Sequence, residues 1–157
     1  KPATCFPTAG TVVQLPGIRR SAEEMGKALG NEAHDLDVNV LLGPGLNIKR
    51  NPLCGRNFEY YSEDPIVAGR MAAGLIRGIQ SNGVSACPKH SAVNSQELRR
   101  QASNSVVDER TMREIYLTAF EIAVREAAPM TIMTSYNEIQ WRLRAREQAP
   151  AAGHLAQ

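Results

Sequence analysis

Cysteine and aromatic residues are scarce in this chain of 157 residues, which has three Cys, one Trp, four Tyr and three Phe. The cysteines at positions 5, 54 and 87 are odd in number, lie far apart and form no Cys-x-x-Cys pair. They favour neither a disulfide framework nor a cysteine-rich zinc site. No Asn-x-Ser/Thr sequon occurs either. These features slightly favour a cytoplasmic location, while secretion stays open because the chain does not begin with Met.

Long apolar runs and a strong net charge are also missing. No apolar run approaches the about 20 residues that span a bilayer, and the first five residues contain no signal-peptide core. Lys and Arg number 18 against 16 Asp and Glu, for a formal net charge of +2. This balance gives no reason to expect nucleic acid or a membrane as a partner. We expect one globular domain, with upstream sequence missing.

Motifs for metal, phosphate and serine-hydrolase chemistry are absent as well. The three histidines show no His-Glu-x-x-His spacing, and residues 43–45 do not match a phosphate-binding glycine loop. Neither Ser91 nor Ser135 lies in a Gly-x-Ser-x-Gly sequence. We therefore expect no metal site and no cofactor.

Helical and strand patterns alternate along the rest of the chain. A capping box at Ser21 to Glu24 predicts a first helix. Asp64 followed by Pro65 predicts a second helix, and Asp108 caps a third that stops at Pro129. Apolar residues at helical spacing mark their inner faces, which include Leu36, Ile66 and Ile115.

A short buried strand is predicted at residues 38–42, and two further strands at residues 84–87 and 130–135, after the second and third helices. The alternation of helix and strand is typical of βα repeats on a parallel sheet. A long loop rich in Asn, Arg, Gly and Pro runs from Leu46 to about Tyr61, and such loops in compact domains are often functional.

Polar residues cluster just after the predicted strands, at the edge of the sheet where α/β proteins bind ligands. We expect one site there that includes Arg56, Lys89, His90, Tyr136 and Asn137. Lys and His donors suit adjacent hydroxyls of a polyol, and the Arg fork suits sugar hydroxyls or a carboxylate.

Each candidate in this site also has a structural interpretation. Lys89 and His90 could be a surface Lys and a core His, and Arg56 could be a loop Arg tied to Glu59 or Asp64. A strand-end tyrosine such as Tyr136 often packs with a polar tip. Glu97 could be a catalytic carboxylate, but a loop anchor is the favoured interpretation.

Four blocks of sequence occur together in one order. They are Pro2-Ala3-Thr4-Cys5-Phe6-Pro7-Thr8-Ala9; Leu42-Gly43-Pro44-Gly45-Leu46-Asn47-Ile48-Lys49-Arg50 running into Cys54-Gly55-Arg56-Asn57-Phe58-Glu59 and Ser62-Glu63-Asp64-Pro65; Lys89-His90 with Asn94-Ser95-Gln96-Glu97; and Val107-Asp108-Glu109-Arg110 through Ser135-Tyr136-Asn137. Together they resemble family 3 of the glycoside hydrolases, and the second block resembles its β-glucosidase branch.

The resemblance implies an α/β fold, here a partial (β/α)8 TIM-like barrel of alternating parallel strands and helices. It implies retaining hydrolysis of terminal non-reducing β-D-glucosyl or β-xylosyl residues by two carboxylates, with no cofactor and a β-glucoside or oligosaccharide as substrate. By position, Arg56, Lys89 and His90 are similar to ligands of the terminal sugar. Met133 matches a residue lining the sugar pocket, and Tyr136 a tyrosine near the nucleophile.

Departures from the family pattern bear on activity. The nucleophilic Asp of a Ser-Asp-Trp segment and the acid/base Glu of a second domain are not in this chain, so no catalytic residue is assigned. Ser91 stands where the family usually has Phe. We expect the chain by itself to be inactive. The alternatives are a non-catalytic carbohydrate-binding fragment or pseudoenzyme, and a purely structural βα domain.

The last segment departs from the family pattern altogether. Residues 1–139 fit the partial barrel domain, whereas residues 140–157 have neither its motifs nor hydrophobic periodicity. If one base had been inserted after the Ile139 codon, the degeneracy of the codons would allow the next reading frame to encode Asn-Gly and the rest of the family segment. We therefore interpret 140–157 as a frameshifted tail and expect it to be extended or irregular from Trp141 onward.

Overall fold

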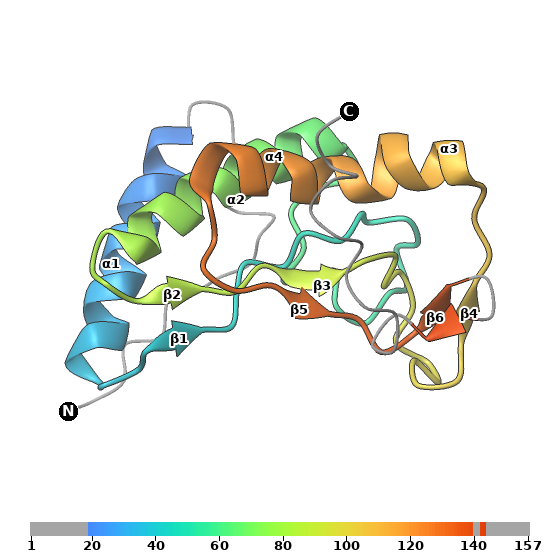
Figure 1. The fold of residues 1–157 in the computed structure, drawn as a ribbon, viewed down its shortest axis with the longest axis horizontal. Helices are drawn as coiled ribbons and strands as arrows, with labels where there is room; N and C mark the ends of the chain where they lie inside the picture. The colour runs from blue at the N-terminus through green and yellow to red at the C-terminus, as the bar shows by residue number, and fades with distance from the viewer. Residues whose placement is uncertain (1–18, 140–141, 144–157) are drawn as a thin grey trace.

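The computed structural model describes residues 19–139 and 142–143, and their helices lie along one side of a layer of short strands (Figure 1). The helices are α1 (Arg19–Asp35), α2 (Pro65–Gln80), α3 (Glu109–Thr111), the π-helical segment η2 (Met112–Leu117) and α4 (Thr118–Ala127). The strands are β1 (Val40–Leu41), β2 (Ser85–Ala86), β3 (Lys89–Ser91), β4 (Asn104–Ser105), β5 (Met133–Thr134), β6 (Glu138–Ile139) and β7 (Arg142–Leu143).

The strands pair in three small sheets. β1 pairs with β2, β3 with β5, and β4 with β6, each in parallel, which confirms the predicted parallel pairing. β7 adds to β6 in antiparallel orientation. Within the described residues these ladders stay separate and do not close into a barrel.

Side-chain caps begin two of the three predicted helices as expected. The Asp64 carboxylate accepts hydrogen bonds from the backbone N–H groups of Ile66, at 2.7 Å, and Val67, at 3.2 Å. The Asp108 carboxylate accepts one from Thr111, at 2.9 Å. The capping box at Ser21 is wrong, because α1 already begins at Arg19. Two arginines, which are good helix formers, precede Ser21 and extend the helix beyond it.

The third predicted helix is one helical segment built from α3, η2 and α4. Its middle turn is a π-helix, where the Thr118 hydroxyl donates to the carbonyls of Arg113, at 2.9 Å, and Glu114, at 2.7 Å. The segment ends at Ala128, which has a left-handed backbone with φ 42°, just before Pro129.

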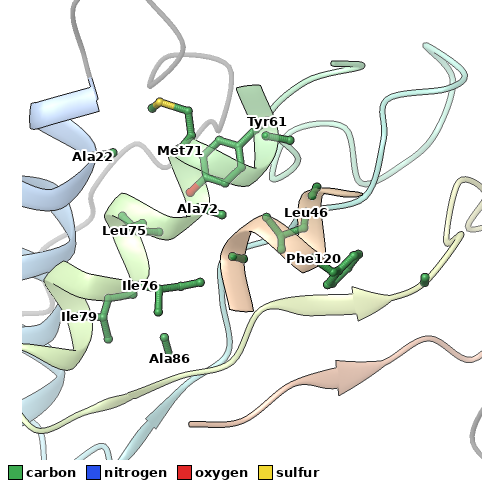
Figure 2. Packing of buried hydrophobic residues seen from close by; sticks show 14 of the residues in the cluster. Ala22, Leu46, Tyr61, Met71, Ala72, Leu75, Ile76, Ile79, Ala86 and Phe120 are labelled. Carbon is green, nitrogen blue, oxygen red and sulfur yellow. The ribbon is translucent and has the colours of Figure 1, made fainter. Parts of the chain in front are cut away.

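The apolar core gathers around α2, as Figure 2 shows. Met71, Ala72, Leu75, Ile76 and Ile79 of this helix are buried. They belong to one cluster with residues of the long loop, of β2 and of α4, namely Leu46, Tyr61, Ala86 and Phe120. Because α2 is covered by α1 on one side and α4 on another, it is the central element of the helical layer.

Four predicted apolar faces, one of a strand and three of helices, are less buried than the sequence predicts. In the segment predicted as a buried strand, Val38, Val40 and Leu42 are exposed by 38%, 41% and 58%, so that prediction is wrong here. Only Val40 and Leu41 of this segment form a strand, and within the described residues that strand pairs with β2 alone, so little of the chain covers these side chains. Leu36, Ile66 and Ile115, predicted on inner helix faces, are exposed too.

Candidate functional site

The ends of the long loop meet at β3. Gly45 forms parallel bridges with both Tyr60 and Lys89. The Leu46 N–H donates to the Lys89 carbonyl at 2.7 Å, and the Lys89 N–H donates to the Pro44 carbonyl at 2.9 Å. These backbone bonds place the side chains of the loop beside those of β3.

A charged cluster of Arg56, Glu59, Lys89 and Glu97 lies where loop and strand meet. The Glu59 carboxylate pairs with the Arg56 guanidinium through one oxygen and with Lys89 Nζ, at 3.0 Å, through the other. Arg56 Nε is also 4.0 Å from Glu97. The four side chains are only 14% to 23% exposed, so the ion pairs are partly shielded from water.

The pKa of the Glu59 carboxyl is lowered by its partners in the cluster. Burial alone would raise the pKa of its carboxyl, but hydrogen bonds and charge from Arg56 and Lys89 outweigh burial and lower it. Glu59 is therefore an anion that binds one cation through each of its two oxygens.

His90 is buried next to this cluster, with 5% of its surface exposed. Asn47 clamps its backbone by donating to the His90 carbonyl at 2.9 Å and accepting from the His90 N–H at 2.7 Å. The Tyr60 hydroxyl lies 3.3 Å from its Nδ1. Burial, reinforced by Arg56 and Lys89, lowers the pKa of His90 to about 4. The imidazole is thus neutral near neutral pH.

The other predicted site residues lie on β5 and just after it. Met133 is the register partner of Lys89, so it borders the cluster through the β3–β5 ladder. Tyr136 is 58% exposed, and the Arg100 guanidinium lies 5.2 Å from the centre of its ring. Asn137 is buried and donates to the Val93 carbonyl at 3.3 Å and to Ser105 Oγ at 3.1 Å. Asn137 therefore joins β4 to β6 rather than facing the charged cluster.

The structural interpretations of two residues gain support. Glu97 accepts hydrogen bonds from Asn94, at 2.9 Å, and Arg100, at 2.8 Å, as a loop anchor does. Arg56 is tied to Glu59, one of the two carboxylates weighed for it. An ion pair on one side of a guanidinium leaves other N–H groups to donate, so this tie does not exclude a ligand.

Three polar residues of the site were missed by sequence reasoning. Asn47, Tyr60 and Asn94 are buried and bond to His90 or to each other. Asn47 and Tyr60 lie in a loop whose polar composition is typical of exposed turns. Composition alone therefore does not show which residues of the loop are buried. The aromatic pair Tyr60-Tyr61, which interrupts that polar run, is a signal that could have indicated burial.

A cavity of ≈ 280 Å³ opens beside the cluster, between α1, α2 and residues 41–45. Met25, Leu29, Leu75 and Ile79 form its apolar walls, and Glu59 and Lys89 line it as well. In the part of the chain that the structure describes, no three His, Cys, Asp or Glu side chains gather as a metal site would require. No helix of this part is long and apolar enough to cross a bilayer.

Known proteins resemble this chain closely over most of its length. The family model of the glycosyl hydrolase family 3 N terminal domain matches residues 1–156. Thermostable beta-glucosidase B of Acetivibrio thermocellus is 53% identical over 138 residues, which are 88% of this chain and 18% of that protein. An exo-alpha-(1->6)-L-arabinopyranosidase of Bifidobacterium longum is 48% identical over 143 residues, 88% of this chain and 18% of that protein.

A solved structure shows the same likeness in three dimensions. Beta-glucosidase 3B of Thermotoga neapolitana in complex with glucose superposes with a TM-score of 0.86 at 48% identity. The match covers 89% of this chain and 19% of that one. The chain therefore spans about a fifth of the length of these proteins.

Proposed function

The chain belongs to glycosyl hydrolase family 3, whose N-terminal domain model it matches over residues 1–156, and from this membership we propose that it supplies part of the sugar site of a retaining β-glucosidase. The substrates are glycosides with a terminal non-reducing β-D-glucosyl, or related β-xylosyl, residue. The pairing of Arg56 and Lys89 on Glu59, beside neutral His90, supports this proposal most directly.

The chemistry of these groups matches that of a sugar. Each hydroxyl of a pyranose offers lone pairs and one proton, and adjacent hydroxyls lie close together. Arg56 and Lys89 offer donors only, whereas neutral His90 has one donor and one acceptor. Glu59 keeps the two cations at a fixed separation before the sugar arrives, which reduces the entropy lost on binding. Met133 and Tyr136 would add contacts to the apolar faces and edge of the ring.

Hydrolysis itself needs two carboxylates on opposite sides of the glycosidic bond, one to attack and one to protonate the leaving oxygen. We propose that neither is in this chain. Of the two carboxylates of the site, Glu59 is held by Arg56 and Lys89, and Glu97 by Arg100 and the Asn94 amide, so both accept in structural bonds.

The architecture of the whole protein is part of the same proposal. The parallel β1–β2 and β3–β5 pairs, with helices between them, are units of a (β/α)8 barrel, of which residues 1–139 would form a part. We interpret residues 140–157 as frameshifted. Most of them lie outside the residues that the structure describes, and only 142–143, which form β7, are described. The nucleotide sequence tests this interpretation. If the bases after the Ile139 codon do not encode Asn-Gly in the next frame, the interpretation fails.

A glucose titration of the isotope-labelled chain, followed by NMR, tests the sugar site. We expect glucose to shift the signals of residues 56, 59, 89 and 90, with an affinity on the order of millimolar. Lys89→Met should weaken binding at least about tenfold, because a charge-assisted hydrogen bond contributes about 1.5–3 kcal/mol. Lys27→Met, which removes a surface lysine paired with Glu23, is the matched control.

Four outcomes would change the proposal. Equal weakening by Lys27→Met, or no signal shifts with glucose, xylose or arabinopyranose, would remove the sugar site. Tighter binding of arabinopyranose than of glucose would favour an arabinopyranoside as the substrate, as in the name of the Bifidobacterium longum relative. Turnover of an aryl β-glucoside by the chain, lost on substitution of Glu59 or Glu97, would show that a catalytic carboxylate lies here.

A further inference from the structure

A series of buried hydrogen bonds connects Glu97, at the edge of the charged cluster, to His90 through the side chains of Asn94 and Tyr60. Glu97 accepts from Asn94 Nδ2 at 2.9 Å, and the same Nδ2 donates to the Tyr60 hydroxyl at 3.1 Å. The Tyr60 hydroxyl in turn lies 3.3 Å from His90 Nδ1. Asn94, Tyr60 and His90 are 3%, 0% and 5% exposed, so water does not compete for these bonds.

The direction of this chain of bonds is set at Glu97. Its carboxylate pairs with Arg100 at 2.8 Å, and an ionised carboxylate can only accept. The Asn94 side chain must therefore turn its NH₂ group toward Glu97, since its own oxygen would be repelled there. The same NH₂ group has a second proton, and that proton goes to the Tyr60 oxygen.

Tyr60 then has one proton to give. Burial raises the pKa of its hydroxyl well above the ordinary value, so it stays protonated. Because the oxygen already accepts from Asn94, the O–H points to His90 Nδ1 at 3.3 Å or to the longer alternative, the Asn94 carbonyl at 3.5 Å. The ring is held in place by Gly45, where an added Cβ would lie 2.8 Å from the Tyr60 ring.

We propose that Glu97, Asn94 and Tyr60 are positioning residues that hold His90 as the tautomer with its proton on Nε2. Nδ1 accepts from Tyr60, and Nε2–H is left as a donor to an acceptor oxygen of the ligand. The assignment of the tautomer stands on the free protein, whereas the donation to a sugar oxygen rests on the proposed function.

Imidazole nitrogen NMR measures the tautomer directly, because protonated and unprotonated ring nitrogens have well-separated shifts. The chain has three histidines, so His34→Gln with His154→Gln leaves His90 as the single imidazole. We expect an acceptor-type signal from Nδ1 and a protonated signal from Nε2 in the free protein. A proton on Nδ1 would overturn the proposal without any further variant.

Tyr60→Phe then removes the hydroxyl while keeping the ring. Without it, the population with the proton on Nδ1 should rise several-fold, and both nitrogen shifts should move toward an average. Tyr61→Phe is the matched control, because Tyr61 is an equally buried neighbour in the apolar core, and it should leave His90 unchanged. Unchanged His90 signals in Tyr60→Phe would contradict the role of Tyr60.

Glucose binding separates the two claims of the proposal, which are the tautomer of His90 in the free protein and its donation to a sugar oxygen. Loss of the ordered tautomer should weaken glucose binding by about 3–10-fold, as for one lost neutral hydrogen bond. If the unsubstituted chain binds no sugar while its His90 carries the proton on Nε2, the proposed function fails and the tautomer assignment stands. If glucose binds equally well to Tyr60→Phe, His90 does not donate to the sugar.

Discussion

The α1–α2 interface and the charged cluster are both well packed, but they are fixed in different ways. Between the helices, Gly26 and Gly78 face each other with no side chain, so the backbones approach closely. In the cluster, Glu59 holds Arg56 and Lys89 by charge, and next to the cluster Asn47 holds His90 by two hydrogen bonds. The helix interface depends on shape, so an added atom should disturb it. The polar site depends on paired groups, so the removal of one partner should disturb it.

The largest effect is expected at the helix interface. A Cβ on Gly78 would lie 2.7 Å from the Gly26 Cα and from the Lys27 backbone nitrogen, so one helix must shift. Gly78→Ala should lower the free energy of unfolding by about 3 kcal/mol or more, measured by urea denaturation. Gly43→Ala is the control, because nothing lies within 4 Å of an added Cβ there. Equal losses in both variants would show that the interface is not the constraint.

The next effect concerns the buried imidazole and pH. The folded state keeps the pKa of His90 at about 4, while an unfolded histidine has about 6.5. As pH falls from about 6.5 to about 4, only the unfolded chain gains this proton, so stability decreases, by at most about 3 kcal/mol in total. His90→Gln should remove this slope between pH 6.5 and 5, and His34→Gln, at an exposed position, should keep it.

Glu59 titrates in a lower range, which separates its effect from that of His90. Its lowered pKa means that the stability it contributes is present above about pH 4.3 and is lost as pH falls through the folded value. At neutral pH, Glu59→Gln leaves two half-buried cations without their anion and should lower the free energy of unfolding by about 2 kcal/mol. Glu121→Gln, in an exposed pair with Arg125, should change it by less than about 0.5 kcal/mol.

The smallest effect is expected at the start of α2. Asp64→Ala removes both hydrogen bonds to the first turn and should cost about 1 kcal/mol. Thermal unfolding followed by circular dichroism measures the change, with exposed Glu63→Ala as the neighbouring control. A loss as large as that of Gly78→Ala would show that the cap, and not the close helix contact, limits stability on this side.

The sequence predicted the helices better than the strands, for a physical reason. Caps such as Asp64 and Asp108 act within one turn, so their effect can be read locally. Strands such as β1 are two residues long and exist through partners elsewhere in the chain. Local periodicity therefore predicted a longer and more buried strand at residues 38–42 than the structure has.

Part of the site was predictable from polar residues that follow the predicted strands, although Lys89 and His90 lie within a strand of their own, β3. Arg56 and Lys89 come together as expected, although their role in sugar binding stays a prediction. The amide clamp of Asn47 and the buried position of Tyr60 were not predictable, because both depend on contacts with His90, which is distant in the sequence. Asn47 lies 43 residues before His90 and Tyr60 lies 30 residues before it. A polar side chain in a loop is exposed or buried according to such distant partners.

The parallel ladders also bear on how fast this chain reaches its fold. The partners in β1–β2, β3–β5 and β4–β6 are 34 to 45 residues apart in the sequence. Closing a loop of that length costs about 2 kcal/mol more in entropy than closing a hairpin of about four residues. Each ladder of two or three residues recovers little of that cost by itself. Folding should therefore begin with collapse of α1 and α4 onto α2, and strand pairing should follow as a late and slow event.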